Sequence, residues 1–233
     1  MLQSRKSLIG YTLTTSDGEL GKVTDFYFDD RNWEVRYIRV ETGNWLFGRK
    51  VLIYPYVVLS VDVDKGTLMI GMTKEEVRHS PNIETDLPVS IQMEIKLYNY
   101  YSLSSYGSAG MGFPTTDMIK SANDTPSEND EQAGHNTHLR SCGHVSGYMI
   151  KDQQAVIGTI EDFIFDTNKW KIPFVSIKPI GQSPFENGAL ATTKLIAIDW
   201  SSGTITVDDT SANMLQNLTF RESGLVTSDA EMN

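Results

Sequence analysis

The chain has 233 residues, 39% of them hydrophobic, and this length suits one large domain or two of about 100 residues each. Its formal net charge of −10 argues against nucleic-acid binding, which takes most of its affinity from Lys and Arg at phosphates. No stretch approaches the roughly 20 apolar residues that cross a membrane, and the single cysteine, Cys142, suits a reducing compartment. We therefore expect a cytoplasmic protein with no membrane insertion and no nucleic-acid partner.

An internal repeat begins near Gly10 and again near Gly147, a shift of 137 positions. Because one register holds without a gap across many strand-like positions, chance does not explain the match. The shift aligns these identical residues: Gly21 with Gly158, Asp25-Phe26 with Asp162-Phe163, Phe28-Asp29 with Phe165-Asp166, and Trp33 with Trp170.

Each copy has the pattern of short strands joined by tight turns. Side chains alternate with period two over 23–28, 33–37 and 172–176, which is typical of half-buried strands. Asp17-Gly18 predicts a hairpin, and 29–32 and 166–169 predict turns of equal length. Five or six antiparallel strands at this spacing predict a small closed barrel in each copy, because closure hides the sheet edges. Gly21 and Gly158 are interpreted as points of close packing or bending.

Helical patterns follow the first copy. Thr73-Lys74-Glu75-Glu76 has the form of a capping box and predicts a short helix through Val77. After Pro88, apolar side chains recur every four residues and predict an amphipathic helix that packs on the barrel or on a partner. Its apolar stripe consists of Val89, Met93, Leu97 and Tyr101.

The composition divides the chain into two domains and a linker. Residues 1–101 are predicted to form the first barrel with its helices, and 137–226 the second barrel. Between them, 102–136 is rich in Ser, Gly, Asn and Asp and lacks periodicity, which indicates a flexible polar linker. Residues 227–233 are predicted to be a polar tail.

A longer phrase carries a family resemblance. From Gly10 it runs Gly-Tyr-x-Leu-x-x-x-Asp-Gly-Glu-Leu-Gly-Lys-Val-x-Asp-Phe-Tyr-Phe-Asp-Asp, and Trp33-Glu-Val-Arg-Tyr-Ile-Arg-Val follows. This resembles the PRC-barrel family, named after the cytoplasmic domain of the photosynthetic reaction-centre H subunit, and the chain looks like the bacterial tandem PRC-barrel proteins. The resemblance implies two PRC-type barrels that dock against other proteins, with no catalytic residues to carry over.

The best candidate interface is a loop in the first copy, Trp45-Leu46-Phe47, together with Met93 and Leu97 of the predicted helix. Apolar side chains at a loop tip are costly to leave in water and mark interfaces. The alternative is that the loop folds back and closes the mouth of its own barrel. The second copy has Gly181-Gln-Ser-Pro-Phe-Glu-Asn at this place and lacks the motif.

Two clusters invite a chemical interpretation. His135, His138, Cys142 and His144 carry zinc-ligand chemistry, but their spacing matches no established finger, so no metal is expected. Asp25 and Asp162 are paired by the repeat and could serve acid–base chemistry. No His or Lys lies nearby to complete a site, so a structural role at a turn or bulge is favoured.

The sequence therefore predicts a non-enzymatic interaction or scaffolding protein without a cofactor, with an unidentified protein partner and a possible homodimer. One alternative is a ribosome- or RNA-associated factor, like the maturation-factor branch of the family. Another is a barrel that binds a small ligand or a metal.

Overall fold

The computed structural model of the chain describes residues 1–80, 100–101, 138–152, 155–180, 188–207, 216–220 and 226–228. In the first repeat the elements are β1 (Leu2–Ser4), α1 (Arg5–Leu8), β2 (Thr12–Thr15), β3 (Gly18–Asp29), β4 (Glu34–Thr42), the 3₁₀ helix η1 (Asn44–Leu46), β5 (Lys50–Ile53), η2 (Pro55–Val57), β6 (Val58–Asp62), β7 (Thr67–Ile70) and α2 (Lys74–Arg78). In the second they are β8 (Leu139–Ser141), α5 (Cys142–Val145), β9 (Met149–Lys151), β10 (Val156–Asp166), β11 (Lys171–Pro179), β12 (Gly188–Ala191), η5 (Thr192–Lys194), β13 (Leu195–Asp199), β14 (Thr204–Val207), β15 (Gln216–Phe220) and β16 (Val226–Ser228).

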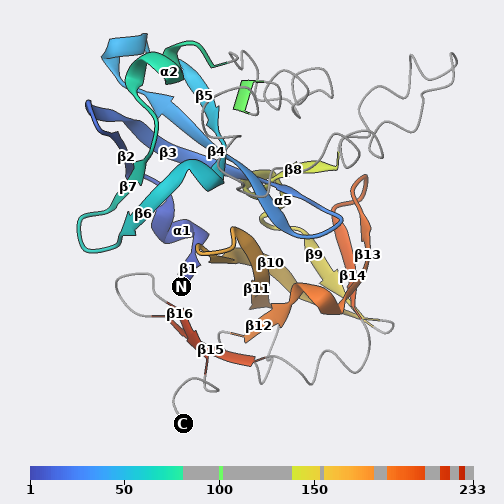
Figure 1. The fold of residues 1–233 in the computed structure, drawn as a ribbon. Coiled ribbons are helices and arrows are strands. Elements are labelled where there is room, and N and C mark those ends of the chain that lie inside the picture. The colour runs from blue at the N-terminus through green and yellow to red at the C-terminus, as the bar shows by residue number, and fades with distance from the viewer. Residues whose placement is uncertain are drawn as a thin grey trace, which may run out of the picture.

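The structure is mainly β with a few short helices, as the sequence predicts (Figure 1). Strands of both repeats join one mixed sheet, in the order β13-β14-β9-β10-β11-β4-β3-β2-β7-β6. The sheet passes from one repeat to the other where Lys171 of β11 pairs with Glu34 of β4.

The expected local signals are present. Thr15 and Gly18 pair across the β2–β3 hairpin, and Gly18 has a φ of 124°, a backbone conformation that glycine adopts without steric cost. The Thr73 side chain accepts the Glu76 N–H while Glu76 accepts the Thr73 N–H, which confirms the capping box of α2.

The prediction of purely antiparallel strands is wrong. β2 pairs with β7 in parallel, and β14 pairs with β9 in parallel. The reason is that a 3₁₀ turn, η2 or η5, joins β5 to β6 and β12 to β13 without a hairpin reversal, so the last strand returns in the direction of the first. The strand pairings of the described residues do not show either repeat closed into a barrel. They leave β6 and β13 at the two ends of the strand order.

Close packing accounts for the two repeated glycines. A Cβ on Gly21 would lie 2.1 Å from the carbonyl oxygen of Glu41, and one on Gly158 would lie 2.6 Å from Ile177 Cγ2. The interpretation of both positions as points of close approach is therefore confirmed.

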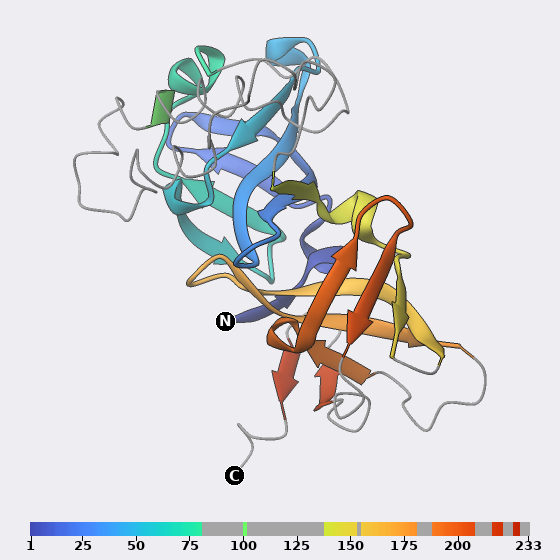
Figure 2. The same ribbon diagram turned by 90° about the vertical axis from the view of Figure 1, so that its right-hand side faces the viewer.

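The first strand of each repeat pairs with a strand of the other repeat. β1 pairs with β10, with Leu2 opposite Asp166, and β8 pairs with β3, with Leu139 opposite Asp29. Figure 2 shows the dark blue β1 beside the amber strands of the second repeat. The predicted division into domains at residues 1–101 and 137–226 stays a prediction. The first strand of each repeat nevertheless lies on the other repeat.

Backbone hydrogen bonds repeat this exchange at the junction. The Val35 N–H donates to the Trp170 carbonyl at 2.7 Å, and the Ile172 N–H donates to the Trp33 carbonyl at 2.8 Å. Each contact has its counterpart 137 positions away, so a pseudo-twofold axis relates the repeats.

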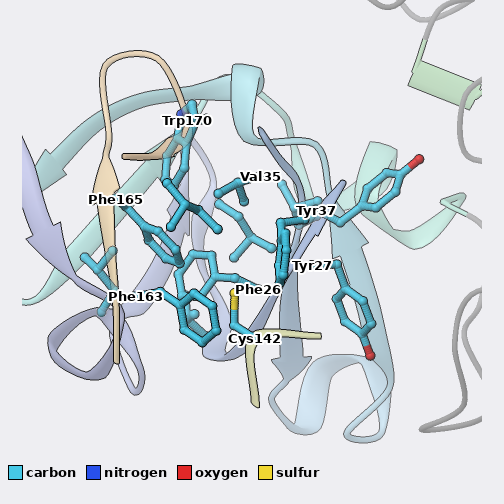
Figure 3. Packing of buried hydrophobic residues seen from close by; sticks show 14 of the residues in the cluster. Phe26, Tyr27, Val35, Tyr37, Cys142, Phe163, Phe165 and Trp170 are labelled. Carbon is cyan, nitrogen blue, oxygen red and sulfur yellow. The ribbon is translucent and has the colours of Figure 1, made fainter. Parts of the chain in front are cut away.

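The repeats share one hydrophobic core, drawn in Figure 3. Phe26 meets Phe165 edge-on with ring centroids 4.8 Å apart, and Phe28 lies 5.8 Å from Phe163. All four rings are fully buried, which stabilises the fold by about 1.5–3 kcal/mol for each phenylalanine. Because these pairs cross between the repeats, we expect the two repeats to unfold together.

Candidate functional site

The Trp45 loop divides into an anchored part and an exposed part. Trp45 is partly buried against the core, and its Nε1–H donates to the Leu20 carbonyl at 2.7 Å. The ammonium of Lys74 and the guanidinium of Arg78 lie 5.7 and 6.0 Å from the Trp45 ring centroid, close enough for cation–π attraction. Trp45 therefore folds back onto its own repeat, while closure of a barrel mouth by this loop stays a prediction.

Phe47 is the exposed residue of the same loop. It is 97% exposed, and its backbone has a φ of 55°, in the left-handed region that a non-glycine residue seldom adopts. Leu46, which lies between Trp45 and Phe47 in the sequence, is half-buried. An exposed aromatic at a strained position of an anchored loop is a candidate contact residue.

Of the helix predicted after Pro88, Val89, Met93 and Leu97 lie outside the described residues. Tyr101 is described and is buried, and its hydroxyl donates to the Leu52 carbonyl at 2.6 Å, so this side chain packs on the first repeat.

The paired aspartates join the two repeats. Asp25 accepts hydrogen bonds from Arg5 Nη2 at 3.0 Å, Ser141 Oγ at 2.5 Å and the Gly143 N–H at 3.1 Å. These partners surround the start of α5, which belongs to the second repeat.

Asp162 makes the equivalent contacts at the start of α1. It accepts from Ser4 Oγ and from the Lys6 N–H at 3.2 Å. Burial raises the pKa of this carboxyl above its usual range, although the hydrogen bond from Ser4 opposes the shift. Both aspartates follow a bulge in their strands and accept backbone amides, as a structural role requires; the sequence did not predict that the amides come from the other repeat.

The histidines and the cysteine of the zinc-like cluster lie in different surroundings. Cys142 is fully buried, and burial raises the pKa of its thiol well above the usual value. The His138 ring contacts Asp30, while the His144 ring lies edge-on to Tyr148. His135 is outside the described residues, and within the described ranges no three His, Cys, Asp or Glu side chains are placed to hold a metal ion.

A groove that the sequence did not predict lies between the repeats. Its volume is about 580 Å³. One wall is the β3–β4 turn of the first repeat with the end of β8, and the other is β13 with η5. We call this the β13 groove; it is lined by Asp30, Arg31, Asn32, Trp33, His138, Arg140, Thr192, Thr193, Leu195, Ile196, Ala197, Ile198 and Trp200.

Arg140 is held rigidly at this groove. Its Nε–H donates to Asp30 Oδ2 at 2.8 Å, and its guanidinium carbon lies 4.3 Å from the Trp200 ring centroid. The side chain of Asp30 is only 7% exposed, and it also contacts His138 Nδ1 at 2.8 Å. Among the described residues no hydrogen bond engages Nη1 or Nη2 of Arg140. The side chain therefore presents planar donors that suit a carboxylate or phosphate.

The groove breaks the pseudo-twofold symmetry. The positions equivalent to Arg140 and Trp200 in the first repeat are Gln3, which is fully buried, and Val63. A comparison of the copies for differences, as well as for identities, would have singled out both residues.

Residues 4–77 match the family model of the PRC-barrel domain, so the first repeat contains one PRC-barrel domain. A second domain is suggested by β9–β14, which repeat the pairing of β2–β7, but the family match does not extend to it. No curated protein matches the chain. No helix within the described ranges is long and apolar enough to cross a membrane.

Proposed function

We propose, from the PRC-barrel domain at residues 4–77, that both repeats are PRC-type barrels and that the chain is a non-enzymatic protein-binding scaffold. The ungapped repeat and the matching parallel closure of β2 with β7 and of β9 with β14 support the second barrel.

The observation that carries the binding function is the exposure of Phe47. A phenylalanine side chain at 97% exposure leaves its whole apolar surface in water, and covering that surface on binding gains about 1.5–3 kcal/mol. Its loop is already fixed by Trp45, so little ordering entropy is lost when a partner covers the ring. Aromatic residues that are rigidly presented in this way are typical interface hot spots.

Photo-crosslinking tests this proposal. A benzoylphenylalanine replaces Phe47 in the full chain, expressed in its source cells, and a matched protein carries the same group at Leu59, a β6 residue with 63% exposure. We expect a discrete crosslinked protein from position 47 that position 59 does not capture. The proposal fails if the two positions give the same products, or if Phe47→Ala leaves the crosslinked partner bound with unchanged affinity.

A further inference from the structure

We propose that the β13 groove binds an extended acidic peptide of another protein, which adds to β13 as a further strand and pairs a carboxylate with Arg140. The groove and the Phe47 loop are separate surfaces, so this site stands or fails independently of the Phe47 interface.

The first support is the open edge of β13. This strand is terminal in the sheet order, and among the described residues it pairs with β14 alone (Figure 2). Four consecutive β13 residues, 195–198, line the groove. Successive side chains of a regular strand point to opposite faces, and β13 is regular from Ala197 onward. Because Ala197 and Ile198 both line the groove, the backbone edge itself borders it. Unpaired N–H and C=O groups on such an edge are a template for strand addition.

The second support is the apolar character of this edge. Native edge strands are commonly protected by Lys, Pro, bulges or inward-pointing charges. β13 has one such feature, a register shift between Leu195 and Ala197, but it contains no Lys or Pro. β13 reads Leu-Ile-Ala-Ile-Asp, and Ile196 is 63% exposed. Trp33 and Trp200 add aromatic surface beside it. An added strand with alternating apolar residues would cover these side chains.

The third support is charge. The chain as a whole is acidic, but the groove lining includes Arg31, Arg140 and His138. Arg31 forms an ion pair with Asp29, and Asp30 contacts both Arg140 and His138, so the attraction of a carboxylate depends on the terminal nitrogens of Arg140. Arg140 is immobilised by Asp30 and Trp200, which leaves its terminal nitrogens to bind a peptide carboxylate.

The fourth support is a precedent within the fold. β1 and β8 are three-residue extended segments that add to β10 and β3 of the other repeat. Short strand addition is therefore a form of association that this sheet already uses. β13 has five residues, which sets the length of the expected peptide core.

The test selects ligands from a displayed library of random eight-residue peptides, using the full chain as bait. The enriched peptides are then synthesised with fluorescein, and their Kd is measured by anisotropy. We expect alternating apolar positions and an Asp or Glu at a constant distance from them. Arg140→Gln, which installs the residue of the first repeat, should weaken binding by about tenfold to a hundredfold, because it removes a charged hydrogen-bond partner.

Ile196→Lys supplies an independent variant, because Ile196 is exposed and its replacement leaves the core intact. It should abolish binding, whereas Leu59→Lys, the equivalent and equally exposed position on β6, should leave the Kd unchanged. Methylation of the peptide amides one at a time should weaken binding at every second position, as strand pairing requires.

Three results would overturn the proposal. One is that no peptide is enriched, and another is that Ile196→Lys binds the selected peptides as tightly as the unaltered chain does. The third is that amide methylation has no alternating effect and free acetate competes, which would make the groove a simple carboxylate site and not a site of strand addition.

Discussion

Asp25 and Asp162 offer a matched pair of perturbations within one molecule. Both carboxyls are buried, both follow a bulge, and both accept hydrogen bonds from the start of the other repeat's first helix. They differ in one respect. Asp25 faces the guanidinium of Arg5, whose side chain is only 14% exposed, while the position equivalent to Arg5 in the second repeat is Cys142.

Replacing either aspartate by Asn removes the negative charge and preserves the shape of the side chain, so the two variants compare the role of the charge at the two positions. Asp25→Asn leaves the buried Arg5 cation without its counter-ion, and removal of one partner from a buried pair costs about 3–5 kcal/mol. Asp162→Asn removes a charge that burial already disfavours and keeps an oxygen acceptor. We therefore expect that change to alter stability by about 1 kcal/mol or less.

Urea denaturation at pH 7, monitored by the fluorescence of the four tryptophans, measures the free energy of unfolding of each variant. Because the core is shared, each variant should give a single transition. The double variant Arg5→Met, Asp25→Asn removes both charges and should regain much of the lost stability. Equal losses for Asp25→Asn and Asp162→Asn, or no recovery in the double variant, would refute the role assigned to the ion pair.

Three further predictions concern the titration of Asp162, the two repeated glycines and Cys142. Burial raises the pKa of Asp162 above its ordinary value of 3.8, so on raising the pH the unfolded chain releases this proton before the folded protein does. The free energy of unfolding of the unaltered protein, relative to that of Asp162→Asn, should therefore fall as pH rises above about 3.8. A constant difference between about pH 3 and 7 in urea titrations would contradict this. Gly21→Ala should lower the free energy of unfolding, measured in thermal melts, by about 3 kcal/mol or more, because the added Cβ would overlap the Glu41 backbone. Gly158→Ala should lower it by less, because one of the close contacts of the added Cβ is a side-chain methyl group. The buried Cys142 thiol should react with a disulfide reagent only after urea unfolding; rapid stoichiometric labelling in native buffer would show that it is accessible.

Much of the secondary structure could be predicted from local signals. The period-two alternation, the Asp17-Gly18 hairpin and the Thr73 capping box depend on neighbouring residues, and the structure has all three features. The parallel pairings were missed because they depend on whether η2 and η5 reverse the chain, and a few turn residues do not specify that direction.

The candidate sites were harder to predict because contacts between distant parts of the chain decide their geometry. Trp45 and Phe47 are neighbours in an apolar loop, and only the hydrogen bond from Trp45 to Leu20 distinguishes the anchored ring from the exposed one. Arg140 and Trp200 are 60 positions apart, and each is unremarkable in its local sequence. They meet only because β8 leaves its own repeat and pairs with β3.

The amino-acid sequence by itself determined the repeat, its register and the strand-forming character of each copy, because backbone propensity and side-chain alternation act over a few residues. Only the tertiary structure decided how the copies combine. The exchange of β1 and β8, the shared phenylalanine core and the reciprocal contacts of Asp25 and Asp162 are long-range contacts whose free energy depends on both copies at once. The β13 groove exists for the same reason, since its walls belong to different repeats and come together only on folding.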